Sequence, residues 1–128
     1  MLQLRPFGPM LRDAVARGYA VPAFNVYNCE SITAAVRSAV AHRAPLILAL
    51  GAKSFDQMRP AFARAVLEAV VAAEEARGHR VPSLGLHLDH CDDPALCQEA
   101  IEAGFSSVMI DASALPFEDN VRITRQVV

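Results

Sequence analysis

Short apolar runs alternate with amphipathic stretches along the chain. Four runs, at residues 19–26, 46–50, 82–88 and 105–110, have the length and apolar content of β-strands. Around them, apolar residues spaced three and four positions apart predict helices at 9–17, 30–42, 60–77 and 94–103, and a last helix from residue 116. This order predicts an α/β fold of four β/α units with a parallel sheet.

Helix-ending and helix-starting residues flank the predicted helices. Three helices are followed by a glycine suited to a left-handed cap: Gly18, Gly78 and Gly104. Asn28 can cap the helix at 30–42, and Asp92 or Asp93 can cap the helix at 94–103. These signals favour a parallel fold, but periodicity alone leaves open a small open sheet or half of an eight-stranded barrel.

Composition narrows the function classes. The chain has 128 residues, 53% of them hydrophobic, so we expect one domain with strands buried on both faces or apolar surface that a partner covers. The net charge of −2 with scattered basic residues argues against nucleic acid, and no apolar run is long enough to span a membrane. Three cysteines without a Cys-x-x-Cys pair predict a reducing, cytoplasmic location.

Residues 86–92, Leu-His-Leu-Asp-His-Cys-Asp, place three titratable side chains at the end of the third predicted strand. Such a group can bind a divalent metal, transfer a proton, or do both. His90 is either a metal ligand or an imidazole that bonds a backbone carbonyl, and spacing does not decide between them. Asp89 is a candidate general acid/base because Asp92 and Asp93 already supply the helix cap. His87 shares the strand parity of Asp89 and is expected to orient it.

The other strands also deliver polar residues at their carboxyl ends, which meet on one rim in this fold class. These residues are Asn25, Lys53, Ser54, Asp111 and Ser113. Lys53 could form a Schiff base, although a solvated loop lysine is the simpler interpretation. His42 and His79 fall at helix ends, where solvated C-terminal caps are expected.

Four segments in order resemble class II metal-dependent ketose-bisphosphate aldolases, the family of the fructose-bisphosphate and tagatose-bisphosphate aldolases. They are Ala-Phe-Asn-Val-Tyr-Asn (23–28), Leu-His-Leu-Asp-His-Cys (86–91), Ala-Gly-Phe-Ser-Ser-Val-Met-Ile-Asp-Ala-Ser (103–113) and Pro-Phe-Glu-Asp-Asn-Val (116–121). The resemblance implies a TIM (β/α)8 barrel that uses Zn²⁺ to cleave a ketose bisphosphate into dihydroxyacetone phosphate and an aldehyde.

The resemblance also implies residue roles. Asp89 would exchange a proton with the C4 hydroxyl of the substrate, and His90 would be the first zinc ligand. Asn25 and Ser54 would bind substrate, and Asp111 would lie near the metal with His87. The segment at 50–54, Leu-Gly-Ala-Lys-Ser, departs from the family's Ser-x-Gly-Ala pattern, so the substrate contacts there are less well supported.

Length is the larger departure, because a barrel of this kind needs about 250 residues. We therefore expect residues 1–128 to form a single N-terminal half-barrel, inactive alone, that pairs with a C-terminal half-barrel or forms a homo-oligomer. In the family the remaining zinc ligands, a glutamate and two histidines, and the glycine-rich phosphate loops lie in the other half. Two alternatives remain: a non-catalytic half-barrel partner subunit, and Schiff-base aldolase chemistry through Lys53.

Overall fold

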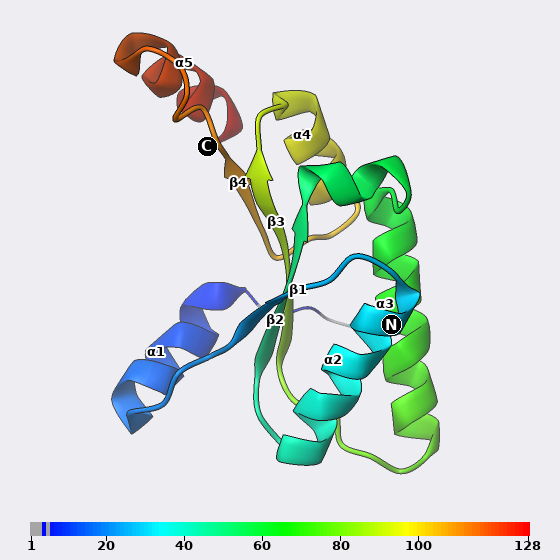
Figure 1. The fold of residues 1–128 in the computed structure, drawn as a ribbon. Coiled ribbons are helices and arrows are strands. Elements are labelled where there is room, and N and C mark those ends of the chain that lie inside the picture. The colour runs from blue at the N-terminus through cyan, green and yellow to red at the C-terminus, as the bar shows by residue number, and fades with distance from the viewer. Residues whose placement is uncertain (1–3, 5) are drawn as a thin grey trace.

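The computed structural model describes residue 4 and residues 6–128, and it confirms the predicted order of elements (Figure 1). The described strands are β1 (Ala23–Asn25), β2 (Leu46–Gly51), β3 (Leu84–Cys91) and β4 (Ser107–Ile110). The helices are α1 (Phe7–Arg17), α2 (Cys29–His42), α3 (Pro60–Ala76), α4 (Pro94–Glu102) and α5 (Phe117–Val127), with a 3-10 helix η1 (Ala52–Asp56) after β2. Among the described residues, no helix combines the length and hydropathy that a membrane span requires.

The strands form one parallel sheet in the order β1-β2-β3-β4, so each strand pairs with the next strand in the sequence. Asn25 pairs with Ala49, Ala49 pairs with His87, and His87 pairs with Ser107. This singly wound order is that of a barrel, whereas an open doubly wound sheet reverses its strand order. The carboxyl ends of all four strands consequently lie at one rim.

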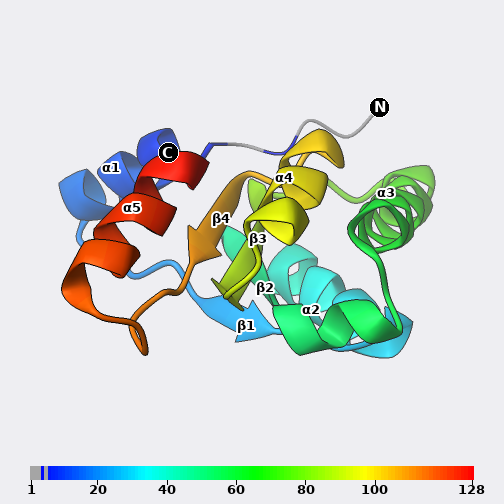
Figure 2. The same ribbon diagram turned by 90° about the horizontal axis from the view of Figure 1, so that it is seen from above.

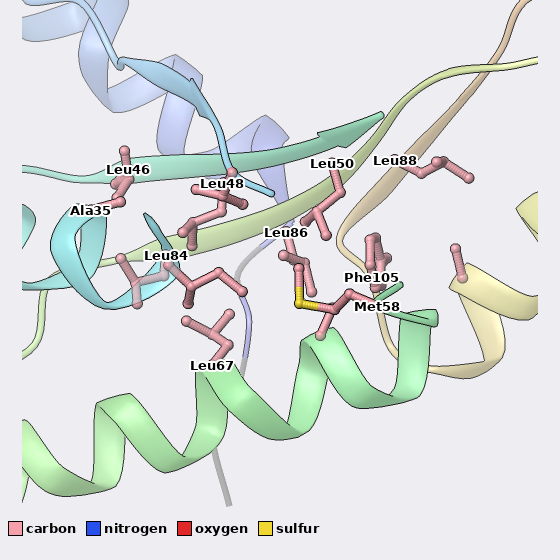
Figure 3. Close-up of a cluster of buried hydrophobic side chains, with 14 of the residues drawn as sticks. Ala35, Leu46, Leu48, Leu50, Met58, Leu67, Leu84, Leu86, Leu88 and Phe105 are labelled. Carbon is pink, nitrogen blue, oxygen red and sulfur yellow. The ribbon is translucent and has the colours of Figure 1, made fainter. Parts of the chain in front are cut away.

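The main core lies between the sheet and the helices α2 and α3 (Figure 3). Alternate residues of β2 and β3 point to this side: Leu46, Leu48, Leu50, Leu84, Leu86 and Leu88. Leu67 of α3 packs beneath them, with no exposed surface. Burying one such side chain contributes about 1.5–3 kcal/mol, so this layer dominates the stability of the described fold.

Helix α1 covers the opposite face of the sheet, while α2, α3 and α4 lie on the first face (Figure 2). Met10 and Ala14 on α1 are buried. The Phe7 ring lies against Gly85, where an added Cβ would be 2.3 Å from Phe7 Cε1. The same ring lies 5.8 Å from the ring of His87, between centroids. Helix α1 therefore supports the strand that carries the candidate site.

Several predicted boundaries were wrong, for reasons of hydrogen bonding. The first strand is limited to Ala23–Asn25 because the Tyr19 N–H donates to Ala14 O and thereby closes α1, and Pro22 has no N–H to donate. The third strand does not end at residue 88 but continues to Cys91, which pairs with Ile110 after an irregularity. The fourth begins at Ser107, because the Phe105 N–H donates to Ala100 O at the end of α4.

Candidate active site

The end of β3 is kinked at His90, and this kink assembles the candidate site. The register of β3 with β4 shifts between Leu88 and Cys91, and His90 has a φ of 49°, in the left-handed region. A regular strand would send Asp89 and His90 to opposite faces. Instead, Asp89 Oδ1 lies 3.9 Å from His90 Nε2 and 3.7 Å from His87 Nε2. The structure thus places the imidazoles of His87 and His90 near the Asp89 carboxylate.

Asp111, after β4, fixes the orientation of the His90 ring. His90 Nδ1 lies 2.6 Å from Asp111 Oδ2, and the Ser113 N–H donates to Asp111 Oδ1 at 3.0 Å. The Ser113 hydrogen bonds, followed by the one from His90, lower the pKa of Asp111 to about 2. Asp111 is therefore a carboxylate near neutral pH and can only accept. Its partner, His90 Nδ1, must carry the proton, which leaves the Nε2 lone pair of neutral His90 free.

A free Nε2 on a histidine held by a carboxylate is the arrangement of a metal-binding imidazole. The His90 side chain is 64% exposed, and its Nε2 is on the side of Asp89. The hydrogen bond to Asp111, with Asp89 adding a smaller effect, raises the pKa of His90, so a metal must displace a proton at acidic pH. Within the described part of the chain no three His, Cys, Asp or Glu side chains are close enough to hold an ion. These residues fit one ligand position of a zinc site together with its orienting carboxylate.

His87 is less exposed than His90, at 19% against 64% of the side chain. Its Nδ1 lies 3.0 Å from Ser107 Oγ. The Phe7 ring packs against the His87 ring on the face of the sheet that is turned away from α2 and α3. Burial lowers the pKa of His87, so this imidazole is neutral near pH 7. A neutral, fixed ring beside Asp89 limits the positions that the carboxylate can take.

Asn25 and Ser54 lie on the same rim but apart from this group. Asn25 is exposed at the end of β1, and Ser54 is half-buried in η1. Among the described residues, neither side chain has a hydrogen bond to Asp89 or His90. Gly51 pairs with Asp89 across β2 and β3, so η1 starts beside the acid/base candidate, and Lys53 in η1 is exposed.

Three parts of the site were not predicted from the sequence: the kink at His90, the Ser107 partner of His87 and the role of Ser113 toward Asp111. The Asp-x-Ser spacing of residues 111–113 was a usable signal, because an aspartate side chain often accepts the N–H two residues ahead. The kink had no comparable signal, since histidine is compatible with both regular and left-handed backbone.

The chain matches the family model described as "Fructose-bisphosphate aldolase class-II" over residues 6–128. It belongs to the class II fructose-bisphosphate aldolase family. A curated family relative, the "Fructose-bisphosphate aldolase" of Treponema pallidum (strain Nichols), is 40% identical over 118 residues, which are 92% of this chain and 35% of the relative. This confirms the family resemblance that the four motifs indicated.

Solved aldolase structures show the same fold. A putative fructose-1,6-biphosphate aldolase from Coccidioides immitis superposes with a TM-score of 0.77 at 34% identity, over 94% of this chain and 45% of that one. The YdjI aldolase from Escherichia coli K12 superposes with a TM-score of 0.79 at 27% identity, over 98% and 46%. The chain thus spans less than half the length of each relative, and its four units correspond to the N-terminal half of the TIM barrel.

Proposed function

We propose that this chain supplies the acid/base and the first metal ligand of a zinc-dependent class II aldolase. The reaction would be the reversible cleavage of a ketose 1,6-bisphosphate into dihydroxyacetone phosphate and an aldehyde. The observation that carries the proposal is the Asp111–His90–Asp89 arrangement, in which an ionised carboxylate fixes one imidazole nitrogen and leaves the other free beside a second carboxylate. Family membership supports the aldolase class of the reaction.

Each residue has a distinct task in this proposal. His90 Nε2 binds the metal, and Asp111 keeps the proton on Nδ1 so that Nε2 stays available. Asp89 accepts the proton of the C4 hydroxyl as the C3–C4 bond breaks, and returns it in the synthetic direction. Bound Zn²⁺ would supply a Lewis acid that withdraws electron density from the substrate carbonyl. Asn25 and Ser54, on the same rim, would contact the substrate.

A complete site requires a second polypeptide segment. Catalytic zinc takes three protein ligands, and His90 supplies one. We propose that a C-terminal half-barrel provides the others, with a second copy of this chain as the alternative source. The sheet edges support such a partner, since β1 and β4 each have one pairing side unused among the described residues. Apolar side chains are exposed near both edges: Phe24, Met109, Leu115 and Phe117.

A chimaera tests the proposal directly. The segment of the Treponema pallidum aldolase that matches this chain is replaced by the 118 matching residues, and zinc content and fructose-1,6-bisphosphate cleavage are measured. We expect one zinc per chain and metal-dependent cleavage. Asp89→Asn should keep the zinc and slow turnover by about 10²- to 10⁴-fold, and His90→Ala should lose zinc and activity together.

Asp92→Asn is the matched control, because it makes the same charge change at an exposed aspartate three residues beyond Asp89. Its turnover should stay close to that of the parent chimaera. Full turnover in the Asp89→Asn variant would remove Asp89 from the mechanism, and full zinc content in the His90→Ala variant would refute the ligand assignment. A correctly assembled, zinc-loaded chimaera without cleavage would favour a non-catalytic half-barrel partner subunit.

A further inference from the structure

A large basic hollow lies at the opposite end of the strands from the candidate active site. It has a volume of about 1360 Å³ and is lined where α1, α2 and α3 end and where β2 and β3 begin. Figure 1 shows these three helix ends and two strand starts at the bottom of the molecule, with α5 and the carboxyl ends of β3 and β4 at the top. The hollow is therefore separate from the rim that carries Asp89 and His90.

A buried carboxylate organises one wall of this hollow. Glu74 on α3 is only 4% exposed. It accepts hydrogen bonds from Arg37 Nε at 3.1 Å, from Arg77 Nη1 at 2.8 Å and from His79 Nδ1 at 2.7 Å. His79 is exposed at the end of α3, as expected of a solvated helix cap, and its ring also donates to the buried Glu74 carboxylate, which the sequence did not predict.

The Glu74 contacts leave the cationic groups available for a ligand. Each arginine has five N–H donors. Arg37 donates one to Glu74, and Arg77 donates to Glu74 and to Ala73 O at 3.3 Å, so most donors of both remain available. Both arginine side chains are about half exposed, at 56% and 51%. Two cations attached to one buried anchor keep a fixed separation, so a ligand orders fewer side chains when it binds.

Formal charge in the hollow is positive although the chain carries −2 overall. Five of the twelve basic Lys and Arg residues line it: Arg17, Arg37, Arg43, Arg77 and Arg80. Asp13 and Glu74 are the lining carboxylates, so the balance is five minus two, or +3. The three helix C-termini contribute about −0.5 each, about −1.5 in total, which leaves the hollow positive. Arg43 and Arg80 have no ion pair within the described residues.

We propose that this hollow binds a small phosphate-bearing anion with two or more negative charges. Guanidinium groups match phosphate oxygens in paired hydrogen bonds, and a cluster of them on a rigid frame favours multiply charged phosphates over single carboxylates. Tyr19 and the prolines Pro9, Pro45 and Pro82 add uncharged surface against which the rest of such a molecule can lie. The proposal does not depend on the aldolase assignment, because it uses none of the residues at the other rim.

Calorimetric titration of the 128-residue chain with inorganic pyrophosphate tests the proposal. We expect saturable binding of one pyrophosphate per chain that weakens as salt screens the charges. The double variant Arg43→Ala/Arg80→Ala removes the two lining arginines that have no ion pair among the described residues, and it should weaken binding by at least about tenfold. Its circular dichroism spectrum should match that of the parent chain.

Lys53→Ala/Arg125→Ala is the matched control, since it also removes two exposed positive charges but away from the hollow. It should bind pyrophosphate as the parent does. Absence of saturable binding to the folded chain would overturn the proposal. Equal weakening in both double variants would also overturn it, because it would show general attraction to positive charge. Loss only in the Lys53 and Arg125 variant would place the anion at the other rim.

Discussion

The contact of α1 with the face of the sheet opposite α2 and α3 allows a quantitative prediction for a substitution at Gly85. An added Cβ would lie 2.3 Å from Phe7 Cε1, whereas carbon atoms in ordinary contact are about 3.5–4.0 Å apart. The ring must retreat by more than about 1 Å, and overpacking of this kind costs about 1–3 kcal/mol. Removing a strand glycine returns about 0.5–1 kcal/mol. Gly85→Ala should therefore lower the free energy of unfolding by up to about 2.5 kcal/mol.

A double-mutant cycle with Phe7→Ala isolates this contact. Without the ring, Gly85→Ala should become neutral or stabilise by up to about 1 kcal/mol, measured by urea unfolding with an unchanged m-value. Gly51→Ala is the control, because its added Cβ would meet nothing closer than Asp89 O at 3.9 Å. If Gly85→Ala had the same effect with and without Phe7, α1 would not be docked on this face and the support of His87 by Phe7 would be refuted.

Three further predictions concern ionisation. Asp111→Asn should lower the pKa of His90 toward 6.5, because it removes the carboxylate that mainly raises it, and an unchanged NMR titration of His90 would show that the contact is absent. Hydrogen bonds from His79 and Arg37 lower the pKa of Glu74, so its stabilising effect is present above its unfolded pKa of 4.5 and is lost as pH falls through the folded pKa. Glu74→Gln should therefore flatten the acid side of the plot of urea midpoint against pH. Of the three thiols, exposed Cys29 should react with Ellman's reagent in the folded chain, while Cys97, whose pKa burial raises to about 12, should react only after denaturation.

The order of helices and strands was predictable because it depends on local sequence patterns such as helix-capping residues. Gly18, Gly78 and Gly104 have φ values of 71°, 80° and 83°, as expected of glycines that end helices. Asn28 caps α2 by accepting from the Ser31 N–H, and Asp93 rather than Asp92 caps α4 by accepting from the Ala95 N–H. Such signals act over a few residues, so one sequence suffices to read them.

Burial of polar groups was less predictable, because it depends on how elements meet. Glu74 continues the buried stripe of α3 that includes Leu67 and Val71, but the sequence does not show which cations would meet a carboxylate there. Packing of α2 on α3 places Arg37 against Glu74, thirty-seven positions away in the chain. The basic hollow depends on this contact, and its arginines look like scattered surface charges in the sequence.

The candidate site combines a predictable part with an unpredictable one at two adjacent residues. Period-two alternation correctly places Asp89 on the face of β3 that carries His87, but it would turn His90 toward the helices. The left-handed backbone of His90 instead turns its side chain to the face that carries Asp89, at a cost of order 1–3 kcal/mol for a non-glycine residue. The hydrogen bonds of Asp111 to His90 and to the Ser113 N–H help to offset this cost. The break in strand regularity, held in place by an ionised carboxylate, leaves one imidazole nitrogen free, and this is the arrangement that the proposed metal-binding role of His90 requires.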